Sequence, residues 1–403
     1  MYDHRQIANQ LDLFHFEPIS PGMVFWHPSG WRLYRRIQDH VRQIYHKSGF
    51  REVRTPEFLK REVWETSGHW EKFSENMFVG GGFSEDPEYA LKPMSCPGHI
   101  HIYKKGVHSY RNLPYRVFEF GTVYRNEPSG SLNGCMRLRQ FTQDDAHVFC
   151  RWDQALDEIA HFFQRVRKLY HAYGFKKLDI KIATRPKNSF GAPEQWQRAE
   201  ELLAQACRQA GLPFDYHIGE GAFYGPKIEL AFNDMLGREW QCGTIQLDFN
   251  MPAKFGLSYR DENHTFERPV ILHQALLGSL ERWIGILLES SQGALPTWLA
   301  PIPVAIASID NSVVEYVANI EDLLQDAGHH VESDISSETI SRKIKRFADQ
   351  KVPIILVIGQ NELQQQSANL RLRGSNQHRS ISLPEFMVFL EKELAMPKLN
   401  NEL

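Results

Sequence analysis

The chain has 403 residues, which is more than a single hydrophobic core usually supports, so two domains are expected. Its 42% hydrophobic and 24% charged residues are typical of a globular protein and argue against a largely disordered chain. The formal net charge of −3 excludes a general basic excess. Any nucleic-acid surface must therefore be a local patch, and DNA is not an expected partner.

The cysteines are odd in number and scattered, which does not fit a disulfide framework and favours a reducing compartment. The N-terminus has no apolar signal segment, and no stretch approaches the ~20 apolar residues that a membrane span requires. We therefore expect a cytoplasmic protein without a membrane partner.

The first three quarters of the chain mix helical and strand patterns, which indicates an α+β domain. In chain order the pattern predicts helices at 3–13 and 30–49, strands at 51–55, 89–92, 115–126 and 139–149, a helix at 152–173, a strand at 178–183, a helix at 194–210, strands at 227–232 and 239–249, and a helix at 276–291. We expect these strands to form an antiparallel sheet flanked by helices.

A turn-rich and proline-rich segment from Gly293 to Pro303 marks a linker. We place the boundary there, with one domain at 1–298 and a second at 299–403. In chain order the second has predicted strands at 304–309, 330–334, 353–359 and 369–373, with helices at 312–327, 338–350 and 383–393. This alternation predicts a small α/β domain with a mixed sheet.

Polar side chains alternate along the predicted strand that ends at Phe149. Gln143, Asp145 and His147 project from one face of this strand, because side chains alternate between faces. A solvated polar face would give the same pattern. Phe141 and Phe149 lie on that face as well, which favours a partly enclosed site.

The preceding strand carries Arg125 and Glu127 on one face, a cation beside a hydrogen-bond acceptor. Such a pair suits a phosphate and an amino-bearing ring. A surface ion pair is an equally good interpretation from these two residues alone.

Longer motifs resemble those of class II aminoacyl-tRNA synthetases. Motif 2 is matched by Tyr124-Arg125-Asn126-Glu127 with Arg137 and Arg139 downstream, motif 3 by Gly278-Ser279-Leu280-Glu281-Arg282, and motif 1 by Pro56. Over almost its whole length the chain is similar to the threonyl-tRNA synthetases. The segments that carry this similarity are Lys92-Pro93-Met94-Ser95-Cys96-Pro97-Gly98-His99, Arg125-Asn126-Glu127-Pro128-Ser129-Gly130 and Gly219-Glu220-Gly221-Ala222-Phe223-Tyr224-Gly225-Pro226-Lys227.

The resemblance implies a catalytic domain at 1–298, an anticodon-binding domain at 299–403, and a short form without an N-terminal editing domain. It also implies a homodimer formed through motif 1. The expected reaction makes threonyl adenylate from threonine and ATP and transfers threonine to the 3′ end of tRNA(Thr). One alternative is a short paralogue that serves another acceptor or acts as an inhibitor-insensitive copy; another is a noncatalytic tRNA-binding module.

By the same resemblance, one Zn²⁺ per subunit is bound by Cys96, His147 and His273, and Mg²⁺ accompanies ATP. The wide spacing of these three residues would not reveal the site unaided. One thiolate and two imidazoles leave coordination open, as catalytic zinc sites do. The amino group and hydroxyl of threonine are expected to complete the shell, so that valine is rejected.

Other roles carried over from the family are assigned as follows. Arg125 is expected to hold the threonine carboxylate and the ATP α-phosphate. Residues assigned to the threonine pocket are Met94, Gln143, Asp145, Tyr224 and Gln246. Residues assigned to ATP, besides Arg125, are Glu127, Arg137, Gln241 and Arg282. His69 is expected near the terminal ribose of tRNA, where it assists transfer, and Lys227 close to the reacting groups.

The anticodon-binding signature departs from the family after Asp334, where the sequence reads Ile335-Ser336-Ser337-Glu338-Thr339-Ile340-Ser341. Glu362 and Arg371 still match positions that contact anticodon bases. A basic phosphate-binding surface is expected from Lys343, Lys345, Arg346 and Lys351. Serine activation without correction in cis is also expected, because loss of one methyl group is worth only ~1 to 3 kcal/mol.

Overall fold

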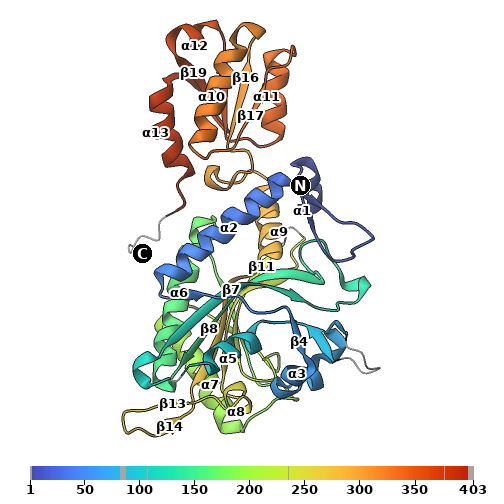
Figure 1. Cartoon of the computed structure of the whole chain (residues 1–403), viewed down its shortest axis with the longest axis vertical. Helices are drawn as coiled ribbons and strands as arrows, with labels where there is room; N and C mark the ends of the chain where they lie inside the picture. The colour runs from blue at the N-terminus through green and yellow to red at the C-terminus, as the bar shows by residue number, and fades with distance from the viewer. Residues whose placement is uncertain (1, 82–87, 107, 235, 376, 398–403) are drawn as a thin grey trace. The chain divides into compact units, whose positions relative to one another are not determined.

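A computed structural model describes residues 2–81, 88–106, 108–234, 236–375 and 377–397 (Figure 1). Contacts within the chain group it into two compact units. The larger consists of Phe16–Val24 and Gln38–Ile286, and the smaller of Met1–His15, Phe25–Ile37 and Leu287–Leu403. The division thus assigns N-terminal segments to the unit that holds the C-terminal domain, and the boundary at 298/299 stays a prediction.

The larger unit is built on an eight-stranded sheet in the order β10-β9-β11-β12-β15-β8-β7-β3. Its strands are β3 (Arg51–Glu52), β7 (Tyr115–Tyr124), β8 (Gln140–Cys150), β9 (Asp179–Ala183), β10 (Asp215–His217), β11 (Lys227–Asn233), β12 (Glu239–Asp248) and β15 (Val270–Ser279). Pairing is antiparallel from β9 to β7, and parallel only at the two ends, where β10 meets β9 and β3 meets β7. The predicted antiparallel sheet with helices is confirmed (Figure 1).

Helices and short strands surround this sheet. They are α3 (Arg61–Ser67), α4 (His69–Phe73), α5 (Cys96–Lys104), α6 (Ala155–Ala172), α7 (Pro193–Gln209), α8 (Met251–Lys254), β4 (Phe58–Lys60), β5 (Val79–Gly80), β6 (Tyr89–Leu91), β13 (Tyr259–Arg260) and β14 (Phe266–Glu267). Helix α6 shows why such helices form: Ile159, Phe162, Phe163 and Val166 recur at helical spacing and are buried. Helices α2 (Pro28–Lys47) and α9 (Leu280–Ser291) each contribute residues to both units.

The prediction of a helix at 276–291 is wrong at its start, because β15 extends to residue 279 and α9 begins only afterwards. Every residue of β15 is buried, and periodicity cannot tell a buried strand from a buried helix. The strand-to-helix junction is held by the Asp144 carboxylate, which accepts hydrogen bonds from the backbone amides of residues 276–278 at 2.7–3.2 Å. At Gly278, with φ of 75°, a Cβ atom would lie 2.4 Å from the Cys242 carbonyl oxygen.

Several elements were not predicted or were too long. Helix α5 was missed, although Pro97 lies in its first turn, where a missing backbone N–H costs no helical hydrogen bond. The strand predicted at 51–55 ends at Glu52 in the structure. Helix α12 (Gln360–Gln365) and strand β20 (His378–Ser382) in the smaller unit were also missed, because both are rich in polar residues.

The C-terminal part of the smaller unit is a five-stranded sheet in the order β17-β16-β18-β19-β20. Its strands and helices are β16 (Val304–Ser308), α10 (Val314–Asp326), β17 (Val331–Asp334), α11 (Ile340–Asp349), β18 (Ile354–Ile358), α12, β19 (Ser367–Leu372), β20 and α13 (Leu383–Leu394). Strand β16 is parallel to β17 and β18, whereas β19 is antiparallel to both of its neighbours, so the predicted mixed sheet is confirmed.

The same unit holds the N-terminal elements α1 (His4–Gln10), β1 (Phe14–His15) and β2 (Phe25–Trp26). None of the helices in the described part of the chain has both the length and the apolar character that crossing a lipid bilayer requires.

Candidate active site

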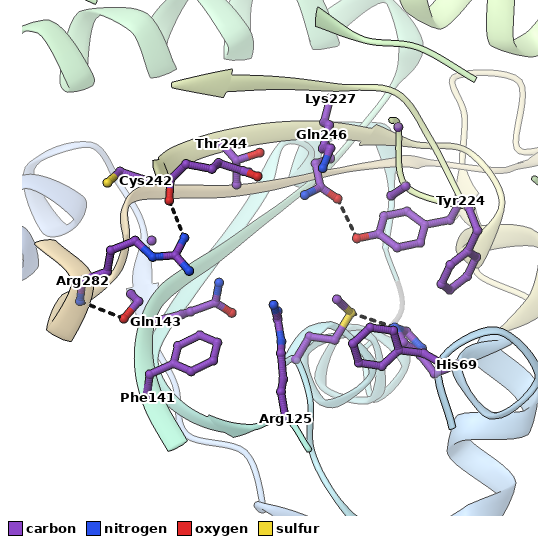
Figure 2. A pocket seen from close by; sticks show the side chains of 18 residues that line it. His69, Arg125, Phe141, Gln143, Tyr224, Lys227, Cys242, Thr244, Gln246 and Arg282 are labelled. Atoms are coloured by element: carbon purple, nitrogen blue, oxygen red, sulfur yellow. Dashed lines mark hydrogen bonds between the residues drawn. The ribbon is translucent and has the colours of Figure 1, made fainter. Parts of the chain in front are cut away.

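A cavity of about 370 Å³ lies within the larger unit (Figure 2). Strands β8, β11, β12 and β15 carry half of its lining residues, and the others come from helices α4 and α9 and from connecting segments. Most of the predicted substrate residues meet here. They are His69, Met94, Arg125, Gln143, Tyr224, Lys227, Gln241, Gln246 and Arg282. Strand pairing brings distant positions together here, since Gln143 on β8 lies opposite Ser279 on β15, which the spacing along the chain could not reveal.

Two guanidinium groups enter this cavity from different elements (Figure 2). Arg125 follows β7, donates through Nε to the Pro93 carbonyl oxygen at 3.3 Å, and lies over the Phe141 ring with 5.1 Å to the centroid. Arg282, on α9, donates to the carbonyl oxygens of Met136 (2.8 Å) and Gln241 (2.6 Å). Burial lowers the pKa of both arginines, but guanidinium groups stay charged at neutral pH, so the cavity is suited to an anion.

A smaller cavity of about 30 Å³ is lined by both of these arginines and by the two remaining predicted ATP residues, Glu127 and Arg137. The turn that presents Glu127 is fixed by Arg139, whose Nε donates to the Glu127 carbonyl oxygen at 2.8 Å. The carboxylate of Glu127 accepts from Ser131 at 3.4 Å. Acceptor and cations therefore face one space, as the nucleotide prediction requires.

Polar groups expected to contact threonine lie in adjacent strands. Tyr224 donates to the Gln246 side chain at 2.6 Å, and Gln246 is paired in register with His273 on the neighbouring strand. Asp145 accepts from the Ser95 backbone amide at 3.2 Å and is 9% exposed. Burial raises the pKa of Asp145. His147 on the same strand face is only 1% exposed. This face is therefore not a solvated polar surface, which was the alternative interpretation of the sequence pattern.

Cys96, His147 and His273 come together as a candidate metal centre. One ligand atom from each lies within 4.8 Å of the others, and all three residues are buried. Helix α5 supplies the cysteine, while β8 and β15 pair so that His147 lies opposite His273. The ring contact of 5.2 Å between Tyr224 and His273 links the cluster to the threonine side of the cavity.

Two side chains behind the cluster orient its imidazoles. Asp248 Oδ2 lies 2.9 Å from His273 Nε2, and His99 Nδ1 lies 2.7 Å from His147 Nδ1. The other ring nitrogens, His147 Nε2 and His273 Nδ1, then face each other at 2.9 Å. Histidine ligands of metals usually have such a partner on the second nitrogen, so the arrangement fits Zn²⁺. Sequence reasoning missed Asp248 and His99, although His99 lies in a motif that it quoted.

Burial raises the pKa of the Cys96 thiol, and the carboxylates of Asp145 and Asp248 act in the same direction. A bound divalent cation acts oppositely and deprotonates a coordinating thiol. The donor set of one sulfur and two nitrogens is that of zinc sites with an open position.

His69 begins α4 beside the cavity and is 1% exposed. Its Nδ1 lies 2.7 Å from Ser67 Oγ and its Nε2 2.7 Å from Met94 Sδ. Burial, followed by the charges of His273, Arg125 and Lys254, lowers the pKa of His69 to about 3. The imidazole is therefore neutral at pH 7. Lys227, the other residue assigned near the reaction, forms an ion pair with Glu229 at 2.7 Å.

The predicted anticodon residues lie in the smaller unit. The Glu362 carboxylate accepts from the Gly359 backbone amide at 2.9 Å, and Arg371 lies on β19 opposite Ile355 and His378. The predicted basic surface requires a correction at Lys343, which is fully buried. Its Nζ donates to the carbonyl oxygens of Ser308 (2.9 Å) and Asp334 (3.1 Å). Lys343 therefore links the last residues of β16 and β17.

Comparison with known proteins identifies the two domain types and the relatives of the chain. Residues 82–291 match the tRNA synthetase class II core domain (G, H, P, S and T), and residues 303–393 match an anticodon binding domain. Threonine–tRNA ligase of Nitrosomonas eutropha is 48% identical over 98% of this chain and 62% of its own length. The chain thus spans about three fifths of the length of the curated relatives it matches.

Two solved structures have the same fold. The RNA binding domain of threonyl-tRNA synthetase from Cryptosporidium parvum Iowa II superposes with a TM-score of 0.95 at 40% identity, over 98% of this chain and 99% of that one. A putative threonyl-tRNA synthetase from Aeropyrum pernix gives a TM-score of 0.85 at 27% identity, over 98% of each chain.

Proposed function

Because the chain belongs to the threonyl-tRNA synthetase family of class II tRNA synthetases, we propose that it is an ATP-dependent threonine–tRNA ligase. In the first step a carboxylate oxygen of threonine attacks the α-phosphorus of ATP, and pyrophosphate leaves. In the second, a ribose hydroxyl of the terminal tRNA nucleotide attacks the carbonyl carbon of the adenylate, and AMP leaves. The observation that carries this proposal is the convergence of two arginines on one cavity, with a Cys/His/His cluster that Tyr224 of the cavity wall contacts through His273.

Arg125 is the residue we assign to the reacting groups. Its guanidinium has planar donors that suit a carboxylate and a phosphate, and it is held by Pro93 and Phe141 before substrate arrives. A preorganised cation stabilises negative charge that develops on the α-phosphate, without a protein nucleophile. Lys227 also lines the cavity, and although its ammonium pairs with Glu229, we assign its remaining hydrogen-bond donors to the reacting groups.

The nucleotide is assigned to the space between the two arginines. Glu127 accepts a hydrogen bond from the adenine amino group, and Arg137 and Arg282 hold the outer phosphates. Gln241 is assigned to the same nucleotide, and its backbone also anchors Arg282. Mg²⁺ binds together with ATP, as phosphate-bound magnesium usually does.

We assign one Zn²⁺ per subunit to Cys96, His147 and His273. When bound, the ion supplies Lewis-acid contacts for the amino group and hydroxyl of threonine. An apolar pocket separates near-isosteres such as threonine and valine by only ~10²-fold, so a contact with the hydroxyl explains stronger selection. Met94, Gln143, Asp145, Tyr224 and Gln246 shape the remainder of the threonine pocket.

His69 is assigned to the transfer step. It is neutral at pH 7 because burial and nearby cations lower its pKa to about 3, and a neutral imidazole can accept a proton. Its position on the cavity wall suits a hydroxyl of the terminal ribose of tRNA.

The remaining assignments concern partners and compartment. Glu362 and Arg371 are assigned to anticodon bases of tRNA(Thr). The edge position of β3 in its sheet, beside Pro56 of motif 1, favours a homodimer through that edge. The five cysteines all lie in the described part of the chain, where they are buried and form no disulfide bond, which favours a reducing cytoplasm.

A second candidate is a synthetase that activates threonine but serves an altered acceptor. It is motivated by the exposed segment after Asp334, where Ser336, Ser337 and Thr339 replace the usual basic signature. Arg346, on the helix that follows this segment, is paired with Asp334 and Glu338 and is therefore less able to bind phosphate.

Threonine-dependent ATP–pyrophosphate exchange and charging of a tRNA(Thr) transcript, run on one preparation, test the proposal. Exchange and charging together support the ligase. Exchange without charging would favour the altered acceptor, whereas the absence of both would favour a noncatalytic module and contradict the proposal.

A further inference from the structure

Ser67 and His69 flank a sharp change of direction between two short helices beside the cavity. Helix α3 ends at Ser67, Gly68 takes a left-handed conformation with φ of 87°, and α4 begins at His69. Both Ser67 and His69 are 1% exposed. Gly68 leaves no room for a side chain, since a Cβ there would lie 2.7 Å from Lys254 Nζ and 2.8 Å from Phe190. The serine and the imidazole are therefore held in one arrangement.

The hydroxyl of Ser67 has one hydrogen and two neighbours. Ser67 Oγ lies 3.1 Å from the Trp64 carbonyl oxygen and 2.7 Å from His69 Nδ1. The Trp64 carbonyl can only accept, and the amide of Gly68, its usual partner in a helix, donates to the Glu65 carbonyl at 3.1 Å instead. If the hydroxyl donates to Trp64, its oxygen is left to accept from Nδ1–H of His69.

The opposite proton arrangement makes weaker bonds. In it the hydroxyl donates to Nδ1, the proton of the imidazole moves to Nε2, and that N–H points at Met94 Sδ, 2.7 Å away. A thioether sulfur is a weak acceptor, and the Trp64 carbonyl loses its hydroxyl donor. A buried carbonyl that lacks a donor is costly, so the first arrangement is favoured.

We propose that Ser67 is a positioning residue that fixes His69 in the tautomer protonated at Nδ1, so that Nε2, which Met94 Sδ caps at 2.7 Å, presents its lone pair to the cavity once that thioether moves aside. This inference rests on the proposed role of His69 in threonine transfer. The low pKa of His69 is consistent with it, since a neutral ring has a single proton to place. Nε2 is then the atom that takes the proton from the attacking ribose hydroxyl, in the way that an orienting group sets the base in other triads.

The tautomer can be read directly by ¹⁵N NMR of protein labelled in its histidine rings, with the His69 signals assigned by their loss in His69→Gln. We expect a protonated Nδ1 and an unprotonated Nε2 in the unaltered protein at pH 7. In Ser67→Ala, we expect a mixed or reversed tautomer, and single-turnover transfer from preformed adenylate should fall roughly tenfold or more. Threonine-dependent pyrophosphate exchange should stay within about twofold, because activation does not use His69.

Ser48→Ala is the matched control. Ser48 directly follows helix α2 and, like Ser67, donates to a carbonyl of the last helical turn, Ile44 O at 2.8 Å, but it lies in another part of the unit. It should leave both the His69 signals and transfer unchanged, and Ser67→Thr, which keeps a hydroxyl, should restore transfer if it folds. Protonated Nε2 in the unaltered protein would overturn the inference whether or not the protein charges tRNA. Ser67→Ala with unchanged tautomer and transfer would overturn it as well.

Discussion

In the larger unit charged side chains converge on an open cavity, whereas in the C-terminal sheet of the smaller unit the charged groups near Asp334 bind one another. Arg125 is held through Nε and its guanidinium points into the cavity (Figure 2). By contrast, Arg346 pairs with Asp334 and Glu338, and Lys343 is buried against backbone carbonyls. A cationic side chain can bind an anionic ligand only if some of its hydrogen-bond donors are not already used within the protein. Arg125 therefore suits a ligand better than Arg346 and Lys343 do, although all three carry the same charge.

The largest effect is expected from Arg125→Ala. Removing a preorganised cation from the reacting phosphate should lower threonine-dependent pyrophosphate exchange roughly 10³-fold. Arg260→Ala is a matched control, since Arg260 also lies 5.1 Å from a phenylalanine centroid but outside the cavity lining. Equal exchange rates for the two variants would contradict the assignment of Arg125 to the reacting groups. They would also contradict the claimed difference between the two regions in their ability to bind a ligand.

Cys96→Ala should remove bound zinc and lower the choice of threonine over valine to roughly 10²-fold, the value for an apolar pocket. Metal analysis of the purified protein and exchange rates with both amino acids check this. Cys207→Ala, which alters another buried cysteine, should change neither. Full threonine activation in a preparation with clearly substoichiometric zinc would contradict the metal assignment.

Serine should support exchange at a rate about 10- to 200-fold below that of threonine, because the two differ by one methyl group and share the amine and hydroxyl. Exchange rates across a range of serine concentrations measure the ratio. The expectation fails if millimolar serine gives no exchange above background.

The smallest effect concerns pH. The pKa of His69 is lowered to about 3, so the neutral base persists as the pH falls below the ordinary histidine value near 6.5. Single-turnover transfer should therefore vary by less than about twofold between pH 5.5 and 8. A fall in rate with a midpoint near pH 6.5 would show that His69 titrates normally, contrary to its buried position.

The sequence alone favoured a partly enclosed polar face with Gln143, Asp145 and His147, because the alternation of side chains along a strand is a local property. The metal cluster could not be predicted in this way, since Cys96 reaches His147 and His273 only through strand pairing, and the family resemblance supplied it.

The errors have equally physical causes. Strand β15 was taken in part for a helix, because all of its residues are buried and the bend at Gly278 depends on distant Asp144. Lys343 was taken for a surface cation, because a sequence shows the charge but not the carbonyl groups that surround it.

The contrast between the two regions is tested most directly by the charging rates of tRNA(Thr) transcripts with the natural and with an altered anticodon. We expect threonine charging of the natural transcript, and a loss of no more than about tenfold when one anticodon base is changed, whereas a well-read base, worth ~1 to 3 kcal/mol, would cost up to roughly 150-fold. Charging that falls about a hundredfold or more would contradict the view that the segment after Asp334 reads the anticodon weakly. No charging of either transcript would contradict the ligase itself.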